Sequence, residues 1–265
     1  MSSHGISGSG RTELAAVAGR RRFISPDDAA AELGVDAQVA SRKLANWAEK
    51  GWLRRVRRGL YIAVPVEAER PEGWSQDAMV VAAAVWSPCY FTGWTAAGYW
   101  SLTEQVFRTT VVKTAQRVRV SQVRLLDTDY LLAHVAEDVM TWGVESIWHE
   151  EVRLHIADPA RTVVDILDAP HIGGGIRHAA EILDAYLDEH DALRLVEYAE
   201  RLGNRAVFKR LGFLAEHLPG RQRLAAACRE RLSQGTAKLD PSAPCPSLVT
   251  RWRLWVPPSW SQGPA

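Results

Sequence analysis

Residues 23–64 read FISPDDAAAELGVDAQVASRKLANWAEKGWLRRVRRGLYIAV, and this stretch decides the fold of the N-terminal part of the chain. The Ser-Pro-Asp-Asp sequence that starts at Ser25 is typical of a helix start, and Gly34 is typical of a helix end. Asp36 can cap a second helix, which we expect to run to about Lys50. Two helices joined by a tight turn that contains glycine form the helix-turn-helix motif.

The second helix of this pair has an apolar face and a polar face. Its apolar side chains recur at helical spacing, and they are Val39, Ala40, Leu44 and Trp47. Its polar side chains are Gln38, Ser41, Arg42, Lys43 and Asn46. A helix fits the major groove of DNA, where Arg can bond guanine at two points and Gln can do so with adenine. We therefore expect Gln38, Ser41 and Arg42 to read bases and the other two to contact phosphates. The alternative is a surface helix whose polar face is only solvated.

A basic β-hairpin is predicted directly after the helix pair. Residues 52–56 and 60–64 read as two strands, and the Arg-Arg-Gly sequence at 57–59 reads as the turn between them. This hairpin would be the wing of a winged helix-turn-helix domain, and its arginines are Arg54, Arg55, Arg57 and Arg58. Arginines at a hairpin tip suit phosphate contact or insertion into a narrow minor groove. The alternative is a solvated hairpin, but four cations without an acid nearby repel one another unless an anion is present.

The chain of 265 residues is too long for one winged helix and fits two or three domains. We expect an α+β protein, with an N-terminal winged helix-turn-helix followed by a larger mixed α/β C-terminal domain that ends in a helical bundle. The expected parts are a disordered N-terminus at 1–10, the winged helix-turn-helix at 11–64, a linker at 65–76 and an α+β domain at 77–265. That last domain divides into a sheet-containing part at 77–157, a mainly helical part at 158–235 and a C-terminal strand at 248–256. We call residues 11–64 the head and residues 77–265 the body.

The net charge of +1 hides an asymmetry along the chain. Residues 20–64 contain 10 Lys or Arg and 5 Asp or Glu, whereas residues 65–265 contain 21 and 25. A basic head on a mildly acidic body suggests that the nucleic-acid contact lies in the head, although surface charge also clusters by chance. The N-terminus lacks the apolar core of a signal peptide, and no apolar run is long enough to cross a membrane. We expect a cytoplasmic protein that does not bind membranes.

Signatures of enzymes and cofactors are weak. Gly173-Gly174-Gly175 does not follow a strand in the GxGxxG form, and His149-Glu150-Glu151 lacks the second histidine of a zinc-protease helix. The three cysteines are far apart and match no zinc pattern. Asp158, Asp165 and Asp168 could cluster, but Asp158 is better explained as a helix cap. We expect no catalytic residue, no metal site and no cofactor.

A second basic stretch lies in the predicted helical part of the body, at residues 201–216. Val207, Leu211 and Leu214 share one face of the expected helix. The cations off this face are Arg201, Arg205, Lys209 and Arg210. Two interpretations stay open: an amphipathic helix with a solvated face, or a surface that binds a partner or DNA.

Four sets of residues follow one another along the chain. They are Gly51–Arg55 with Arg58–Tyr61, Tyr90–Ala97 with Leu102–Gln105, Asp158–Asp165 with Pro170 and Gly173-Gly174, and Lys209–Glu216. In order and spacing they resemble the antitoxins of abortive-infection type IV toxin–antitoxin systems, the AbiEi family. The resemblance extends over about residues 22–256, nearly the whole chain.

The resemblance implies a winged-helix head and a larger C-terminal antitoxin domain. It also implies that the protein represses its own operon by binding inverted repeats in double-stranded DNA, and that it neutralises a nucleotidyltransferase-like toxin encoded beside it. Two copies would bind the repeats. These two copies need not form a dimer in solution and could pair once they are on the DNA. The family offers no catalytic residues to carry over, and the resemblance leaves open whether the antitoxin touches the toxin.

Two other functions compete with this interpretation. The first is a ligand-sensing transcription regulator, in which the aromatic stretch at residues 90–100 lines a pocket instead of forming core. The second is a metal nuclease with a winged-helix targeting head, which would need paired carboxylates around a metal. A neighbouring nucleotidyltransferase gene would count against the first, and incubation with DNA and magnesium would test the second.

Overall fold

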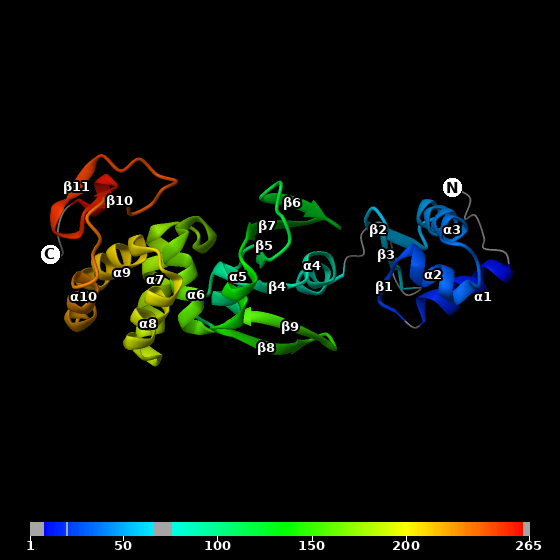
Figure 1. Cartoon of the computed structure of the whole chain (residues 1–265), viewed down its shortest axis with the longest axis horizontal. Helices are drawn as coiled ribbons and strands as arrows, with labels where there is room; N and C mark the ends of the chain where they lie inside the picture. Colours follow the sequence, from blue (N-terminus) through cyan, green and yellow to red (C-terminus); the bar gives the residue numbers. More distant parts are fainter. Residues whose placement is uncertain (1–7, 20, 66–75, 262–265) are drawn as a thin grey trace. The chain divides into compact units, whose positions relative to one another are not determined.

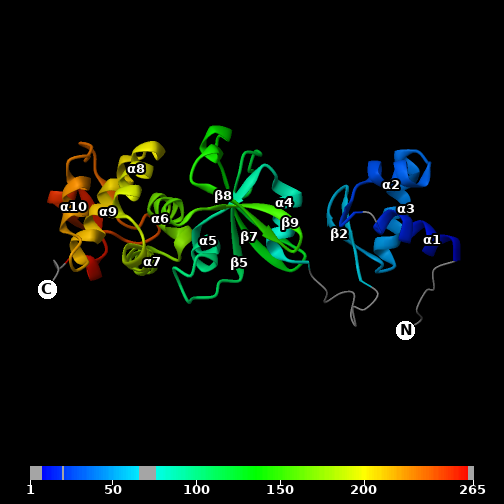
Figure 2. The same cartoon turned by 90° about the horizontal axis from the view of Figure 1, so that it is seen from below.

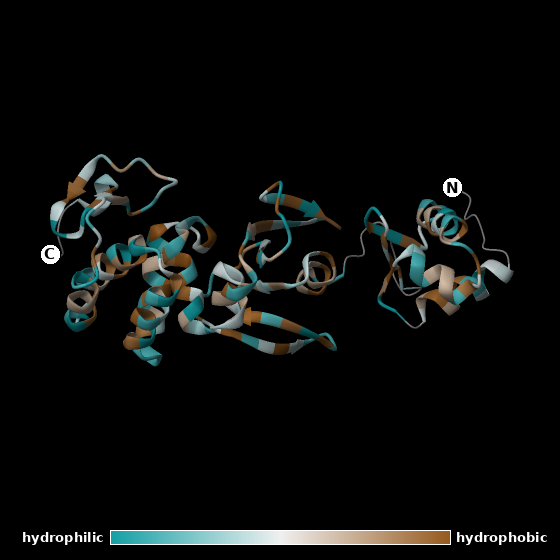
Figure 3. Ribbon diagram, in the orientation of Figure 1, coloured by the Kyte–Doolittle hydropathy of each residue, from teal (hydrophilic) through white to brown (hydrophobic). Residues whose placement is uncertain are grey.

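The computed structural model describes residues 8–19, 21–65 and 76–261 (Figure 1). The chain forms two compact units, one of residues 1–84 with Arg124–Thr128, and one of Val85–Val123 with residues 129–265. The first unit contains the head, and the second contains most of the body. Helix α4 (Ala78–Trp86), which is strongly apolar in Figure 3, spans the boundary in sequence between them.

The head begins earlier in the chain than the sequence suggested. Residues 1–7 of the expected disordered terminus, and residues 66–75 of the expected linker, lie outside the described residues. Gly8–Gly10 were also expected to be disordered, but they form the first turn of α1 (Gly8–Ala18). The hydroxyl of Thr12 donates to the Gly8 carbonyl at 3.2 Å within that turn. The helix therefore extends through small residues whose own preferences do not favour it.

The two helices of the expected helix-turn-helix form as predicted. Helix α2 (Pro26–Leu33) is capped by Ser25, whose hydroxyl accepts from the Asp28 amide at 3.1 Å. Gly34 ends this helix with a φ of 65°, a conformation that costs glycine least. Asp36 caps α3 (Ala37–Glu49), and its carboxylate accepts from the amides of Gln38 and Val39 at 2.8 and 2.9 Å.

The wing packs with a short third strand. Strands β1 (Phe23–Ile24), β3 (Leu60–Ala63) and β2 (Leu53–Arg57) form a sheet in that order, and both pairings are antiparallel. Together with α1, α2 and α3 they bury one apolar core, whose residues are Val17, Ile24, Ala29, Ala40, Leu44, Trp47, Leu53 and Tyr61. The apolar face of α3 thus faces the core, and its polar face is left for solvent or a ligand.

The body is built on a six-stranded mixed sheet with the order β6-β7-β5-β4-β9-β8. Its strands are β4 (Cys89–Phe91), β5 (Thr109–Thr114), β6 (Gln122–Leu125), β7 (Thr128–His134), β8 (Val144–His149) and β9 (Val152–Ala157). Strand β4 pairs antiparallel with β5 and parallel with β9, while β8 and β9 form an antiparallel hairpin. Brown and teal residues alternate along this hairpin in Figure 3, as expected for a sheet with one covered face.

Helices gather beside one end of this sheet (Figure 2). They are α5 (Gly93–Tyr99), α6 (Pro159–Asp168), α7 (Ile176–Glu189), α8 (Ala192–Leu202), α9 (Arg205–His217) and α10 (Gln222–Arg229). Asp158 caps α6 as predicted, because its Oδ1 accepts from the Arg161 amide at 2.7 Å. Every residue of α6 from Ala160 to Leu167 is buried, so this helix lies at the centre of the body's core.

The C-terminal segment differs from the single strand expected at residues 248–256. It forms two short antiparallel strands, β11 (Ser247–Val249) and β12 (Leu254–Val256), joined by a helical turn. Arg253 takes a φ of 53° there, and this reverses the chain before β12. With β10 (Ala237–Lys238) they make a separate three-stranded sheet, so the mainly helical part is followed by a small sheet. The α+β class, with a winged head and a larger mixed body, is confirmed.

Candidate nucleic-acid interface

Helix α3 presents the polar side chains that the sequence assigned to DNA. Gln38, Arg42 and Asn46 are exposed, and Ser41 and Lys43 are half-buried. Ala40, Leu44 and Trp47 hold the opposite face in the core. Because a buried apolar face fixes the rotation of the helix about its axis, the exposed residues Gln38, Arg42 and Asn46 point away from the core in one defined arrangement.

One of these residues is already engaged inside the head. The Nζ of Lys43 lies 2.6 Å from Oε2 of Glu13, which comes from α1. Both side chains are about one-third exposed, at 34% and 37%. Sequence reasoning did not predict this pair, since the two residues are 30 positions apart. The contact ties α1 to α3 and holds the Lys43 ammonium beside a carboxylate.

The wing exposes three of its four arginines. Arg55, Arg57 and Arg58 are exposed around a turn in which Gly59 has a φ of 75°. A β-bulge between Arg55 and Arg57 shifts the register, so that Leu53 and Val56 are both buried. The bulge leaves Arg55 and Arg57 exposed on the way to the tip, where cations can approach a nucleic-acid backbone.

Arg54 has a different environment from the other wing arginines. It is half-buried, and its Nη2 lies 2.9 Å from Oδ2 of Asp127, a residue of the same compact unit. The guanidinium of Arg55 instead lies 5.9 Å from the centre of the Tyr61 ring. The exposed cations at the wing are therefore those of Arg55, Arg57 and Arg58.

Two of the four cations of the second basic stretch are buried and cannot contact a partner or DNA, whereas Arg201 and Arg205 are exposed. Lys209 and Arg210 are only 2% and 4% exposed, and both lie on α9. Lys209 donates to the Gly235 carbonyl, and Arg210 donates to the carbonyls of Lys238, Leu167 and Asp168 at 3.0, 2.8 and 3.1 Å. Burial lowers the pKa of both side chains. Lys209 and Arg210 hold the end of α6 and the segment at residues 235–238 against α9, and they are not part of a solvated face.

A buried charged cluster in the body was not predicted. Asp165 is completely buried, and its Oδ1 accepts from Lys113 Nζ and from Arg161 Nε, both at 2.9 Å. Its Oδ2 accepts from the hydroxyls of Tyr90 at 3.1 Å and Thr92 at 2.8 Å. Burial by itself would raise the pKa of Asp165, but the two cations lower it. The cluster joins β4 and β5 to α6.

The three aspartates that could have clustered are separate. Asp158 caps α6 and accepts from the Tyr198 hydroxyl at 2.7 Å. Asp165 lies in the buried cluster, and Asp168 accepts from the Asn204 side chain at 2.6 Å. Within the described ranges, no three His, Cys, Asp or Glu side chains gather closely enough to hold a metal ion.

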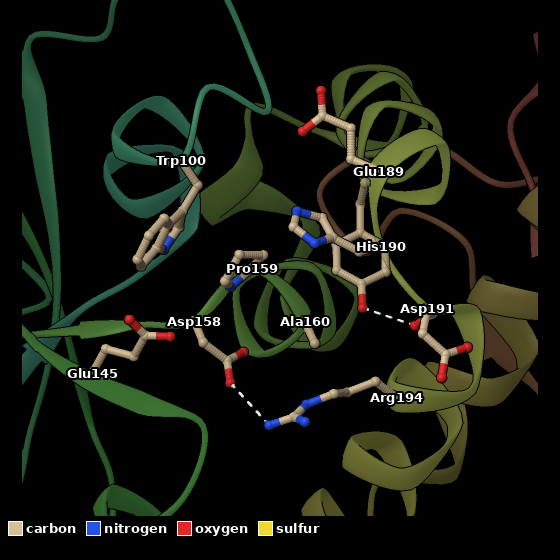
Figure 4. A pocket seen from close by; sticks show the side chains of 10 residues that line it. Trp100, Glu145, Asp158, Pro159, Ala160, Glu189, His190, Asp191 and Arg194 are labelled. Carbon is tan, nitrogen blue, oxygen red and sulfur yellow. Dashed lines mark hydrogen bonds and ion pairs between the residues drawn. The ribbon is translucent and has the colours of Figure 1, made fainter.

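The body also contains a polar pocket of about 580 Å³ (Figure 4). Its lining residues are Trp100, Glu145, Asp158, Pro159, Ala160, Tyr186, Glu189, His190, Asp191 and Arg194. Arg194 extends toward Asp158, with 3.9 Å between its Nη2 and Oδ2 of the aspartate. Burial raises the pKa of Tyr186 and keeps its hydroxyl protonated, and that hydroxyl donates to the Asp191 carbonyl.

The aromatic stretch at residues 90–100 contributes little to this pocket. Tyr90 and Phe91 are buried, and Trp94 donates to the Thr109 carbonyl at 2.5 Å. Of this stretch, only Trp100 lines the pocket, and its ring nitrogen donates to the Ala157 carbonyl at 2.7 Å. Tyr90 and Phe91 thus form core and Trp94 and Trp100 pack against it, as one of the two interpretations of the sequence expected, whereas Tyr99 is exposed.

Comparison with known proteins bears on the head most directly. Residues 12–64 match a family model described as "Transcriptional regulator, AbiEi antitoxin". The match confirms the resemblance in the part of the chain that it covers, and it supports a role as a transcriptional regulator of the antitoxin class. It covers the first of the four stretches that carry the resemblance. No protein among the curated ones matches this chain.

One solved structure extends the likeness of fold to the body. The crystal structure of the RV2827C protein from Mycobacterium tuberculosis superimposes with a TM-score of 0.66 at 13% sequence identity. The alignment covers 95% of this chain and 92% of that chain. At this identity the likeness concerns the fold alone. As for membranes, each helix among the described residues is too short or too polar to cross a bilayer.

Proposed function

We propose that this chain is an antitoxin-class repressor that binds specific double-stranded DNA through its head. The observation that carries the proposal is the exposed polar face of α3, in a domain whose wing exposes Arg55, Arg57 and Arg58. The family match over residues 12–64 supports the same assignment. In winged helix-turn-helix domains the second helix of the motif enters the major groove, and the wing contacts the flanking backbone.

The proposal assigns separate roles to the polar side chains of α3 and to the arginines of the wing. Gln38, Ser41 and Arg42 read base edges, since Arg and Gln recognise guanine and adenine by paired hydrogen bonds. The wing arginines contact phosphates or enter a narrow minor groove. Two copies bind the two halves of an inverted repeat upstream of the protein's own operon. Centres of such half-sites lie about 34 Å apart, one turn of the DNA helix, or a multiple of that.

A gel-shift experiment with the DNA upstream of the gene tests this part of the proposal. We expect a shift with the wild-type chain and none when Arg42, Arg57 and Arg58 are all replaced by Ala. Arg117 is an exposed arginine of the body, and R117A is the matched control that should shift like the wild type. Absence of a wild-type shift, or a shift that survives the triple substitution, would contradict the proposal.

The second part of the proposal concerns the toxin. We infer that the body supplies antitoxicity against a nucleotidyltransferase-like toxin encoded by the adjacent gene. With the toxin expressed from an unrelated promoter, the full chain should restore growth. The variant without DNA binding (R42A, R57A and R58A) should restore growth equally, because its body is unchanged. Rescue that requires DNA binding would contradict this part of the proposal, because the unrelated promoter already excludes repression of the toxin gene.

The proposal includes no catalytic step. Incubation of the pure protein with duplex DNA and Mg²⁺ should leave the DNA intact, and cleavage would favour the metal-nuclease alternative.

A second candidate function has an observation in its favour, the polar pocket of about 580 Å³ in the body. A regulator that senses a small ligand would bind it there, with Asp158 and Arg194 as polar contacts and Trp100 as an apolar wall. A reporter behind the operator, in cells without the neighbouring gene, would then respond to growth conditions. The response would disappear in a W100A variant. A reporter that stays constant excludes this function.

A further inference from the structure

Helix α3 has a second polar face beside the base-reading one. Gln38 and Arg42 are four positions apart and lie on the first face. Lys43, Asn46 and Lys50 are spaced by three and four positions, so they share another face on the flank of the helix. The flank carries two cations and an amide, and it is turned toward α1, where Glu13 contacts Lys43.

This flank forms one side of a groove of about 450 Å³ within the head. Glu13 on α1 and Trp52 at the entry to β2 line the groove, together with Arg42, Lys43 and Asn46 of α3 and Lys50 at its C-terminal cap. The Nζ of Lys50 lies 5.1 Å from the centre of the Trp52 ring, and this contact holds it at the groove. Three cations and one amide therefore surround a space in which Glu13 is the sole acid among the lining residues.

The groove suits an anion with several oxygen atoms. Ammonium, guanidinium and amide groups are the donors that bind phosphate, and these are the side chains that α3 supplies here. The Glu13 carboxylate occupies the place against Lys43 that such an anion would take, at 2.6 Å. An ion pair with both partners one-third exposed contributes little to stability, so phosphate can replace the carboxylate easily.

We propose that this groove binds a phosphate of the DNA backbone next to the bases that α3 reads, and that Glu13 competes with that phosphate for Lys43. The inference rests on the proposed function, because it assumes that the head binds DNA. It adds Lys50 to the contact residues and gives α1 a role in the interface. Glu13 then lowers affinity for every DNA sequence alike, since a backbone phosphate carries no sequence information.

The test compares E13Q, K43Q and K50Q with the wild type on two duplexes. One is the duplex from upstream of the gene, and the other is a shuffled duplex of the same composition. Binding is measured by fluorescence anisotropy over a range of salt concentrations. The matched control is E104Q, which removes the same charge from an exposed position in the other compact unit. Thermal unfolding verifies that each variant is folded.

We expect E13Q to tighten binding to both duplexes by the same factor, roughly three- to tenfold, while E104Q binds like the wild type. K43Q and K50Q should each weaken binding to both duplexes equally and reduce the slope of log K against log salt by about 1, as loss of one phosphate contact does. The K43R variant keeps the positive charge, so it should bind with the affinity and the salt slope of the wild type.

Three results would overturn the inference while leaving the proposed function intact. These are E13Q binding no tighter than E104Q, K43Q weakening one duplex only, or a salt slope that none of the substitutions changes. If the wild-type chain binds neither duplex, the proposed function fails, and the inference fails with it.

Discussion

Helices α3 and α9 are both 13 residues long, and both carry two adjacent basic residues in the middle of an amphipathic pattern. In α3 these are Arg42 and Lys43, and the arginine is exposed. In α9 they are Lys209 and Arg210, and both are almost completely buried against main-chain carbonyls. The difference lies in what covers the helix. The segment at residues 235–238 and the end of α6 cover Lys209 and Arg210, whereas Arg42 on α3 is open to solvent.

The comparison shows that two adjacent basic residues on a helix do not by themselves indicate a binding surface. In α3 the exposed Arg42 and the partly exposed Lys43, whose ion pair with Glu13 is itself partly exposed, can bind phosphate at little cost to stability. A buried pair is held by the carbonyls around it, and removing it leaves those carbonyls without donors. Substitutions in the two helices should therefore separate stability from DNA affinity.

The largest effect is expected at the buried charges of the body. Substitution D165N leaves Lys113 and Arg161 without their carboxylate in a site that is closed to water. The free energy of unfolding of the body should fall by about 3 to 5 kcal/mol, as it does when one partner of a buried ion pair is removed. Urea unfolding followed by tryptophan fluorescence measures this. D129N, at an exposed position on β7, is the control and should change stability by less than about 0.5 kcal/mol. Equal stability of the two variants would show that Asp165 is dispensable.

A somewhat smaller loss is expected within α9 itself. Substitution R210M removes the donor for three carbonyls, and we expect the free energy of unfolding to fall by about 3 kcal/mol. R205A, on the same helix, removes an arginine that is 45% exposed and paired with Glu200, so its cost should stay under about 1 kcal/mol. Neither substitution should change the affinity of the folded protein for DNA. A loss of affinity in R210M at a temperature where it is folded would show that α9 acts in binding.

The reverse pattern is expected in α3. Substitution R42A should leave the free energy of unfolding within about 0.5 kcal/mol of the wild type, because the side chain is exposed. Its binding free energy for the specific duplex should weaken by about 1 to 3 kcal/mol, that is, the affinity should fall about 5- to 150-fold. Affinity for a shuffled duplex should fall less, since a base contact is lost along with the charge. An equal loss on both duplexes would make Arg42 a phosphate contact.

The parts of this arrangement that could be predicted from the sequence are those fixed by local chemistry. The caps at Ser25, Asp36 and Asp158 follow from residue type and position, and all three form the expected hydrogen bonds. The apolar repeat of α3 correctly predicted which face is buried. Local signals of this kind act within one or two helical turns, so a single sequence is enough to find them.

The parts that could not be predicted depend on residues far apart in the chain. Glu13 meets Lys43 over 30 positions, and Arg210 meets Lys238 over 28. The partners of Asp165 include Tyr90, at a separation of 75. Charged residues in a sequence predict exposure by default, and that default fails where tertiary structure supplies a partner. This is why the stretch at residues 201–216 could not be assigned from its pattern.

The smallest effect is expected at the cap of α2, which separates the stability of the head from its contact with DNA. Substitution S25A removes the hydroxyl that accepts from the Asp28 amide, at a cost of about 1 kcal/mol of unfolding free energy. It leaves the polar face of α3 unchanged, so the affinity of the folded protein for DNA should equal that of the wild type. A loss as large as that of R42A would show that the cap positions the recognition helix.

The same cap has a pH dependence with a defined sign. Hydrogen bonds from Ser25, with Arg21 nearby, hold the pKa of Asp28 below its ordinary value of 3.8. Because the folded-state pKa is lowered, the stabilisation by Asp28 is fully present above 3.8 and is lost as the pH falls through the folded-state value. S25A removes the side-chain hydrogen bond, so protonation of Asp28 lowers the stability of this variant less than that of the wild type. The difference in thermal stability between wild type and S25A should therefore shrink as the pH is lowered from 5 toward about 3. A difference that grows over this range would mean that the protonated form of Asp28 is the one the fold stabilises.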